Sequence, residues 1–444
     1  MHPSRPHSPG DVAQPARKTP KIEALARAAV EIREHLTRGI IPFWQGRALD
    51  VKDGGYRTRF DENGTHTGTP TKYLNTQCRL LWWFSTLARN GIDVSENLAR
   101  ARDGFSFLMQ HFWDGEEGGW YWRTQSDGSE PDRGKVVYGQ SFAIYALAEY
   151  ARAGGGARAL DLARQTFDLL HVYCADVEHG GYLENLERDW RPSAPGFCAG
   201  DRKSLDTHMH LMEAFTVLAE ASGAAVHRRR LREVVRLICE RMIDPETGCG
   251  RNQFDLSWRP LPAIAIRRTW NAERQGEAPA APLDTTSYGH NTELAWLLRR
   301  AVEMEPEELA RVRPFLRGLL DHAAAQGVDR EFGGIFRDGT ARGGAVVMEK
   351  EFWQHAEALV GFLDGVELFG EAAYAEAFLN LWDFVRDHFI APCGEWRVLL
   401  DRRGTPLDRA VGNDWKVSYH TGRAMLECTQ RLERLLSRSN GGAS

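Results

Sequence analysis

The chain has 444 residues, of which 42% are hydrophobic and 26% are charged, with a formal net charge of −5 and a pI near 6.3. This length and composition fit one large helical ring or about two or three ordinary domains. The acidic balance argues against a sequence-wide electrostatic attraction to nucleic acid or anionic membranes, so we expect a neutral small-molecule substrate.

The N-terminal stretch, residues 1–20, is rich in Pro, Arg and Ser and lacks the apolar core of a signal peptide, which predicts a disordered leader. We expect one catalytic domain over residues 21–437 and a flexible tail over residues 438–444. No run approaches the ~18 apolar residues that cross a bilayer. Seven scattered cysteines contain no CxxC pair, which argues against a disulfide framework and a structural zinc site. This usage favours a reducing compartment, and we expect a cytoplasmic protein.

A Gly-rich turn followed by a short polar and aromatic strand recurs six times along the sequence. With one glycine of each copy as its marker, the copies lie at Gly55, Gly119, Gly181, Gly250, Gly334 and Gly394. A spacing of roughly 60 to 85 residues is typical of a repeated supersecondary unit. The longest interval contains residues 259–286, which are rich in Pro, Ala and charged residues, and we interpret them as an inserted loop.

The hydrophobic pattern between the markers is helical. Residues 140–150 carry bulky apolar groups on all sides, as in a buried helix, whereas residues 159–170 have one apolar stripe, as in a surface helix. A short hairpin follows the first marker, with its turn at Asn63 and Gly64. Six such units that close on themselves form an all-α (α/α)6 barrel with short β-hairpins on one rim; an open stack of repeats is the alternative.

The inner helices of such a barrel begin at one rim, so polar residues at equivalent positions in the repeats meet in one pocket. His210, His290 and His420 lie in comparable settings, at the start of an apolar helical run. His210 and His290 also precede Glu213 and Glu293 by three residues, which places each pair on one helix face. The other residues that this positional argument puts in the pocket are Arg79, Tyr138, Trp353, Glu357 and Trp415.

Histidine titrates near neutral pH, so a pair can act as base and acid on two faces of a substrate. Removal of a proton next to a carbonyl carbon and its return on the opposite face inverts that carbon. Three histidines can instead bind Zn²⁺, but the neighbouring aromatic residues favour a carbohydrate, and we predict neither a metal nor another cofactor. Trp353 can alternatively be a core residue, and Glu357 an ion-pair partner of Arg79. The histidines expected to be ordinary exposed residues are His2, His7 and His227.

Several segments resemble the N-acylglucosamine 2-epimerase superfamily, and within it the cellobiose 2-epimerases and mannose isomerases. They are residues 77–85 (QCRLLWWFS), 137–143 (VYGQSFA), 207–214 (THMHLMEA), 287–290 (SYGH), 352–358 (FWQHAEA) and 415–420 (WKVSYH). The resemblance spans residues 22–435. It implies an (α/α)6 barrel enzyme that acts on the reducing-end sugar and needs no metal or nucleotide for proton transfer.

The resemblance also implies roles for individual residues. His290 and His420 correspond to the acid and base at C2 of the sugar, His210 helps to open the sugar ring, and Arg79 holds the oxygens of an enediolate. The further residues that we predict to bind the sugar are Tyr138, His208, Glu293, Trp353, Glu357 and Trp415.

Two positions depart from the cellobiose 2-epimerases. Phe352 stands where they usually have tryptophan and Asp206 where they usually have asparagine, so both a monosaccharide and a disaccharide stay open as substrates. An aldose–ketose isomerase shares the enediolate and returns the proton to C1. A glycoside hydrolase that uses Glu293 and Glu357 and a non-catalytic sugar-binding barrel are further alternatives. We expect a monomer or homodimer, with residues 259–286 forming a rim loop that sets substrate preference.

Overall fold

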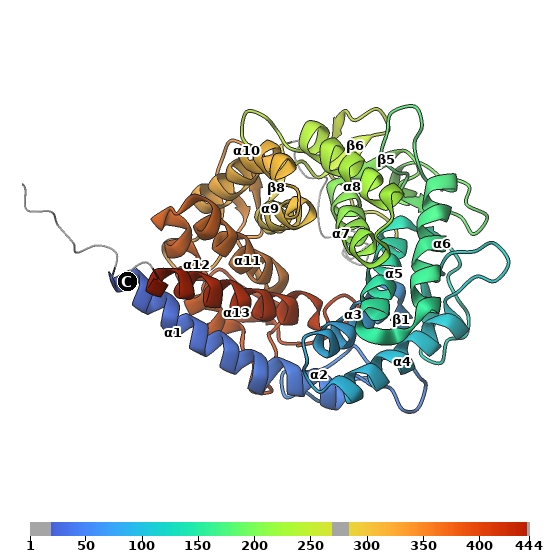
Figure 1. Ribbon diagram of the computed structural model, residues 1–444, viewed down its shortest axis with the longest axis horizontal. Coiled ribbons are helices and arrows are strands. Elements are labelled where there is room, and N and C mark those ends of the chain that lie inside the picture. Colours follow the sequence, from blue (N-terminus) through green and yellow to red (C-terminus); the bar gives the residue numbers. More distant parts are fainter. Residues whose placement is uncertain (1–18, 269–283, 442–444) are drawn as a thin grey trace, which may run out of the picture.

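The inner wall of the protein is a ring of helices, each of which packs against the next one in the sequence. The computed structural model describes residues 19–268 and 284–441. Within these residues the inner helices are α3 (Leu74–Arg89), α5 (Val137–Tyr150), α7 (Leu205–Ser222), α9 (Tyr288–Val302), α11 (Phe352–Phe369) and α13 (Ser418–Gly441). Because α13 also packs against α3, the ring closes (Figure 1). The predicted (α/α)6 barrel is confirmed, and the open stack of repeats is wrong.

A second layer of helices surrounds this ring. Its members are α4 (Val94–His111), α6 (Ala157–Tyr173), α8 (Ala225–Leu237), α10 (Pro306–His322) and α12 (Ala372–Phe384). The N-terminal helices α1 (Thr19–His35) and α2 (Ile41–Arg47) complete the layer, because α1 packs against both α12 and α13 (Figure 1). The two ends of the chain thus close the barrel side by side. Residues 1–18 of the predicted leader and 442–444 of the predicted tail lie outside the described residues.

Short helical turns of other types connect these helices. They are π-helical turns at Leu36–Ile40, Ala151–Gly155, Ile238–Met242, Ala323–Gly327 and Val385–Phe389, and a 3₁₀ turn at Gly196–Cys198. None of the helices in the described part of the chain is both long and apolar enough to cross a membrane.

The two helix types follow the hydrophobic pattern of the sequence. Every residue of α5 is buried, and its first charged side chain, Glu149, comes at the second-last position. In α6 the buried residues, among them Leu162, Phe167 and Leu170, form one stripe. His227 of α8 departs from expectation, because only 4% of it is exposed and its ring packs against Phe167 with Nδ1 2.6 Å from the Ser222 hydroxyl. The prediction of an exposed His227 is wrong; His2 and His7 lie outside the described residues.

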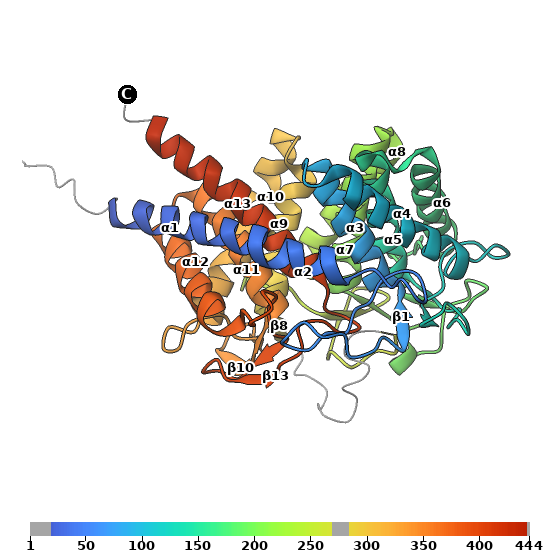
Figure 2. The same cartoon turned by 90° about the horizontal axis from the view of Figure 1, so that it is seen from below.

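Short strands gather at the end of the ring where the inner helices begin (Figure 2). Those that precede an inner helix are β1 (Thr71–Tyr73), β3 (Lys135–Val136), β5 (Arg202–Ser204), β8 (Thr285–Ser287) and β11 (Lys350–Glu351). Each pairs antiparallel with a strand of the following repeat, namely β2 (Arg123–Gln125), β4 (Asn185–Leu186), β6 (Gln253–Asp255), β9 (Asp338–Thr340) or β12 (Leu399–Leu400). β7 (Pro260–Leu261), β10 (Ala345–Val347) and β13 (Pro406–Asp408) add third strands. A bridge between Phe60 and Gly412 joins the last repeat to the first.

The Gly-rich turns are held by a repeated buried ion pair. Lys135 is fully buried and donates to Asp114 Oδ2 at 2.9 Å and to the Gly118 carbonyl at 2.7 Å, both in the preceding turn. The equivalent pairs are Lys72–Asp50, Lys203–Asp176, Lys350–Asp329 and Lys416–Glu395. Thr286 takes the lysine position before α9 and donates to the Gly250 carbonyl at 2.8 Å. These contacts fix the start of each inner helix relative to the turn before it.

This repeat corrects the register of two predicted markers. The residue just after the marker forms a bridge, as in Leu49 with Tyr56 and Val328 with Ile335. In the fourth and sixth copies the bridging residues are Gly250 and Trp396. The marker positions are therefore Cys249 and Glu395, one residue away from the predicted Gly250 and Gly394.

The predicted insert is shorter than residues 259–286. Pro260–Leu261 forms β7, and β8 begins at Thr285. After β7 the chain passes over the neighbouring repeats, where Ile266 is buried and Arg268 pairs with Asp132 at 2.8 Å. The rest of the insert, residues 269–283, lies outside the described residues.

Candidate active site

A polar pocket of about 240 Å³ opens at the strand end of the ring. Its lining residues are Arg79, Tyr138, Asp206, His210, His290, Glu293, Glu351, Phe352, Trp353, Val398, Asp408, Asn413, Trp415 and His420. The structure thus brings the predicted site residues to one pocket, with the exception of Glu357 and His208.

The histidines reach this pocket at two depths. His290 and His420 each lie four residues after the strand position that Thr286 and Lys416 occupy. In the repeat of His210 the equivalent strand residue is Lys203, and His210 lies seven residues after it. Glu293 likewise lies seven residues after Thr286, so His210 corresponds in position to Glu293. Because an α-helix turns once in about 3.6 residues, His210 lies about one turn deeper than the other two histidines. The predicted equivalence of the three histidines therefore holds for His290 and His420 but not for His210.

Two serines begin the helices that carry His210 and His290. Ser204 Oγ accepts the amide N–H of Thr207 at 3.2 Å, and Ser287 Oγ accepts the amide N–H of His290 at 3.4 Å. Such N-caps satisfy amide groups that the first helical turn leaves unpaired. They fix the first turns of α7 and α9, and with them Asp206 and His290, at the rim of the pocket.

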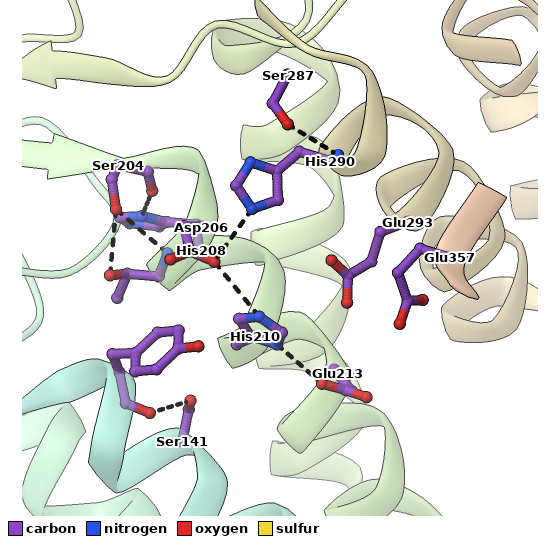
Figure 3. A network of polar contacts seen from close by, with 12 residues as sticks. Ser141, Ser204, Asp206, His208, His210, Glu213, Ser287, His290, Glu293 and Glu357 are labelled. Atoms are coloured by element: carbon purple, nitrogen blue, oxygen red, sulfur yellow. Dashed lines mark hydrogen bonds and ion pairs between the residues drawn. The ribbon is translucent and has the colours of Figure 1, made fainter. Parts of the chain in front are cut away.

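A carboxylate lies between two of the histidines. Asp206 Oδ1 is 3.4 Å from Nε2 of His210 and 3.7 Å from Nε2 of His290 (Figure 3). The other ring nitrogen of His210, Nδ1, lies 3.0 Å from Glu213 Oε2. Both nitrogens of His210 therefore face carboxylates.

His420 has a different partner. Its Nδ1 lies 2.6 Å from Glu357 Oε1, and the other oxygen of Glu357 accepts the indole N–H of Trp296 at 2.9 Å. When Nδ1–H donates to Glu357, Nε2 of the neutral ring carries a free electron pair and can take a proton. Glu357 thus lies beneath His420 and acts on the pocket through it.

Arg423 joins the carboxylates below the pocket. Its Nη2 donates to Glu293 at 2.9 Å and to Glu357 at 2.7 Å, and its Nη1 donates to Glu213 and to the Tyr419 hydroxyl. Only 2% of Arg423 is exposed. One guanidinium therefore compensates acidic groups from α7, α9 and α11. The proposed pair of Glu357 with Arg79 is wrong, because Arg423 is the cationic partner of Glu357.

Arg79 lies in the pocket wall, held by polar and aromatic groups. It donates to the Tyr138 hydroxyl at 2.9 Å and to the Trp415 carbonyl at 3.0 Å. Its guanidinium lies 4.4 Å and 4.6 Å from the ring centroids of Phe142 and Tyr419. These contacts hold the Arg79 guanidinium beside the histidines. Among the described residues, no acidic side chain forms an ion pair with it.

Aromatic rings form the upper walls. The ring of Trp353 is 4.7 Å from that of His290 and 5.8 Å from that of His420, so one indole contacts both imidazoles. Trp415 packs against two further aromatic residues, and its ring centroid lies 5.6 Å from that of Tyr73 and 5.9 Å from that of Trp122. Such flat apolar faces suit the C–H faces of a sugar ring.

His208 does not reach the pocket. It is fully buried, its Nδ1 donates to the Ser204 carbonyl at 2.8 Å, and its Nε2 accepts the amide N–H of Tyr182 at 3.0 Å. Gln77 and Gln140 accept the amides of Tyr56 and Trp120 in the same way. His208 is therefore part of the repeated turn, and its prediction as a sugar-binding residue is corrected on this geometry.

Burial and neighbouring charges separate the histidines by pKa. Burial lowers the pKa of His290, against the raising effect of Asp206. Burial and the cations Arg79 and Arg423 lower the pKa of His420 well below its usual value. Burial also disfavours charge on His210, but hydrogen bonds to Asp206 and Glu213 outweigh it and raise its pKa to about 9. At neutral pH the pocket thus contains two neutral imidazoles and one imidazolium.

Glu293, Glu357 and His420 could in principle bind a metal, since each offers a ligand atom within 4.8 Å of the others. Burial and the neighbouring Glu357 raise the pKa of Glu293 to about 8. Both carboxylates already accept hydrogen bonds from Arg423, whose guanidinium takes the place that a cation would need. The donor set therefore fits an internal ion-pair network better than a metal site, and the absence of a metal stays a prediction.

Sequence reasoning missed several residues of this site. In the sequence, Asp206 and Phe352 stand out only as departures from a pattern near the expected sugar contacts, and no motif points to Glu351, Val398, Asp408 or Asn413. Arg423 could have been found, because it is a charged residue inside the apolar run that follows His420. Its three acidic partners lie on other helices and could not have been assigned from spacing.

The match to a family model covers most of the ring. Residues 54–424 match the model of N-acylglucosamine 2-epimerase (GlcNAc 2-epimerase). The chain belongs to this family. The resemblance seen in the sequence motifs is therefore confirmed, and with it the enzyme class, an isomerase of carbohydrates.

Individual relatives agree with this assignment. The chain is 28% identical over 405 residues to a cellobiose 2-epimerase of Bacteroides fragilis. The aligned region covers 89% of this chain and 97% of that protein. It is 24% identical over 388 residues to a D-mannose isomerase of Marinomonas mediterranea, with 86% and 92% covered. Among solved structures, cellobiose 2-epimerase from Spirochaeta thermophila superposes with a TM-score of 0.80 at 29% identity, covering 95% of this chain and all of that one.

Proposed function

We propose that the chain epimerises the reducing-end aldose of a cellobiose- or mannose-type sugar at C2, through an enediolate. The observation that carries this proposal is the pair of histidines in the pocket, His290 and His420, which contact the same indole of Trp353. Both have a lowered pKa, so both are neutral at neutral pH. A neutral imidazole is the form that accepts a proton from carbon.

The two histidines divide the reaction between them. One histidine, in its neutral form, takes the proton from C2 of the open-chain aldose. The other takes up the proton that the C1 hydroxyl loses when the sugar ring opens, and as an imidazolium it returns this proton to the opposite face of the same carbon. Their roles exchange in the reverse direction, since the product differs from the substrate only at C2. Glu357 orients His420 through Nδ1 and leaves Nε2 for the sugar.

His210 and Arg79 handle the oxygens. The imidazolium of His210 can donate a proton to the ring oxygen when the sugar opens. Arg79, whose guanidinium lies against the rings of Phe142 and Tyr419, is placed to stabilise the negative charge that develops on the enediolate oxygen. Tyr138 and Glu293 supply further polar contacts in the pocket, and Trp353 and Trp415 supply stacking faces.

The relatives named cellobiose 2-epimerase and D-mannose isomerase support a disaccharide or monosaccharide aldose as the substrate. An aldose–ketose isomerase is the alternative on the same residues, because the enediolate can take its proton at C1. A glycoside hydrolase is disfavoured. Its two carboxyls must reach the glycosidic bond, whereas both Glu293 and Glu357 are engaged by Arg423 and Glu357 lies behind His420.

Incorporation of solvent deuterium tests this proposal. Cellobiose, mannose and N-acetylglucosamine are incubated with the protein in deuterated water, and the products are separated and examined by NMR. Deuterium at C2 of an epimer supports the epimerase, and deuterium at C1 of a ketose supports the isomerase. Absence of deuterium from all three sugars and their products would refute both.

Substitutions separate catalysis from sugar binding. His290→Asn and His420→Asn should each abolish measurable turnover while a sugar still binds. The matched control is His355→Gln, because His355 accepts the amide of Ile335 at 3.0 Å as Gln140 accepts that of Trp120. The control should keep most of the activity. Equal turnover in His420→Asn and wild type would contradict the assigned pair.

A further inference from the structure

Asp206 occupies an unusual place among the charged groups of the pocket. It is the second residue of α7, about a quarter of its side chain is exposed, and it lines the pocket. Its Oδ1 lies 3.4 Å from His210 and 3.7 Å from His290, so a single oxygen faces a nitrogen on each ring (Figure 3). Within the described residues the ion pairs of Asp206 are with these two histidines.

The second acidic partner of His210 is shared with other groups. Glu213 lies 3.0 Å from His210 Nδ1 but also accepts hydrogen bonds from the Tyr419 hydroxyl and from Arg423. A carboxylate that already faces a guanidinium attracts a further proton less strongly. Asp206 is therefore the carboxylate whose charge acts mainly on the histidines.

Other charged and titratable groups also face this pair of histidines. They are Glu293 on α9, Arg79 on α3, Tyr138 on α5, His420, Tyr419 and Arg423 on α13, Glu357 on α11 and Asp338 on β9. Positive charges on His210 and His420 oppose each other, whereas Glu293 favours a positive charge on His210. Of the acidic groups that favour the imidazolium form of His210 against burial, Asp206 has the largest effect.

We propose that Asp206 is a positioning residue that keeps His210 in its imidazolium form and fixes the ring of His290, so that one carboxylate prepares an acid and a base for the same sugar. His210 presents Nε2–H toward Asp206 and the pocket, while Nδ1–H is held by Glu213. His290 is held with Nε2 toward the same oxygen. The proton for ring opening is thus stored next to the base that acts at C2.

Asp206→Asn removes the charge and keeps the shape of the side chain. Loss of an opposite charge at this range lowers the pKa of a histidine by about one to three units. We expect the pKa of His210 in Asp206→Asn to fall from about 9 to between about 6 and 8. Asp206→Glu, which keeps a carboxylate, should restore part of the difference.

The primary measurement is the pKa of His210 in the free protein, read from NMR titration of histidine rings labelled with ¹⁵N. The His210 signal is assigned by its loss in His210→Gln. The control is Asp161→Asn, which removes an equal charge from the surface of α6, where 59% of the Asp161 side chain is exposed. A fall of the His210 pKa in Asp206→Asn and none in Asp161→Asn supports the proposal. An unchanged His210 pKa in Asp206→Asn overturns it.

The consequence for catalysis rests on the proposed function and is measured separately. The alkaline limit of kcat/KM should move to lower pH in Asp206→Asn by the same amount as the pKa of His210. If the pKa falls and the alkaline limit stays, the catalytic part of the proposal is wrong. If wild type turns over none of the tested sugars, the proposed function fails, while the NMR titration still decides the role of Asp206.

Discussion

The buried guanidinium of Arg423 allows a prediction with a definite size. It donates to Glu293 at 2.9 Å, to Glu357 at 2.7 Å and to Glu213, three acidic residues from three inner helices. Arg423→Met keeps an unbranched side chain of similar length and removes the charge. Because the carboxyls stay buried, the variant leaves them without their cation.

Loss of one partner of a buried ion pair costs about 3–5 kcal/mol of unfolding free energy. The cost does not triple with three carboxyls, because a buried carboxyl can take up a proton and become neutral. Burial disfavours charge on Glu213, but Arg423 and other partners lower its pKa below the usual value, so loss of Arg423 lets burial raise that pKa. A carboxyl whose pKa is raised in the folded protein loses stabilisation as the pH rises above its unfolded value, about 4.3. The difference between variant and wild type should therefore grow between about pH 5 and pH 8.

Urea unfolding followed by circular dichroism measures this difference at several pH values. The control is Arg33→Met, because Arg33 on α1 and its partner Glu433 on α13 are both more than half exposed. Exposed pairs contribute at most about 1 kcal/mol. A loss below about 1 kcal/mol in Arg423→Met at pH 8, or a loss that is greater at low pH, would refute the assigned role of Arg423.

The pH dependence of kcat/KM should be bell-shaped. At low pH, kcat/KM rises as His420 becomes neutral, with a pKa well below the usual value of histidine. At high pH, kcat/KM falls as His210 loses its proton near pH 9. Initial rates measured between about pH 5 and pH 10 check both limits. A rising limit above neutral pH would contradict the neutral base. Trp353→Ala should raise KM by about tenfold, because a stacked aromatic ring contributes about 1 kcal/mol or more to binding. Trp353→Phe keeps an aromatic ring and should change KM less. Equal KM values in wild type and Trp353→Ala would argue against stacking of the sugar on Trp353. Ala263 and Ile266 border a side cavity of about 120 Å³ that shares Tyr138, Asp206 and His290 with the pocket, and Ala263→Phe should lower kcat/KM for cellobiose more than for mannose. An unchanged ratio of the two values would count against a role of this segment in substrate preference.

The position of Asp206 illustrates how far sequence reasoning extends. The motif around residues 207–214 identifies the helix and the family, and the spacing of His210 and Glu213 correctly places them on one face, 3.0 Å apart. The contact between Asp206 and His290 joins two helices that are far apart in the sequence. It depends on how α7 and α9 are rotated and how deep each one lies, which no single segment specifies.

The sequence by itself determined the repeat, the alternation of buried and amphipathic helices, and the rim at which the polar residues gather, because these depend on local hydrophobic period and on turns that need glycine. The tertiary structure decided which polar residue of each helix faces the pocket. His208 and His210 are two residues apart, so they point to nearly opposite sides of α7, and packing against the neighbouring helices places His208 in the turn and His210 in the pocket. Packing also selects the ion pairs. Arg423 meets three acidic residues because the ring closes around it, and that closure exists only when all the repeats are assembled.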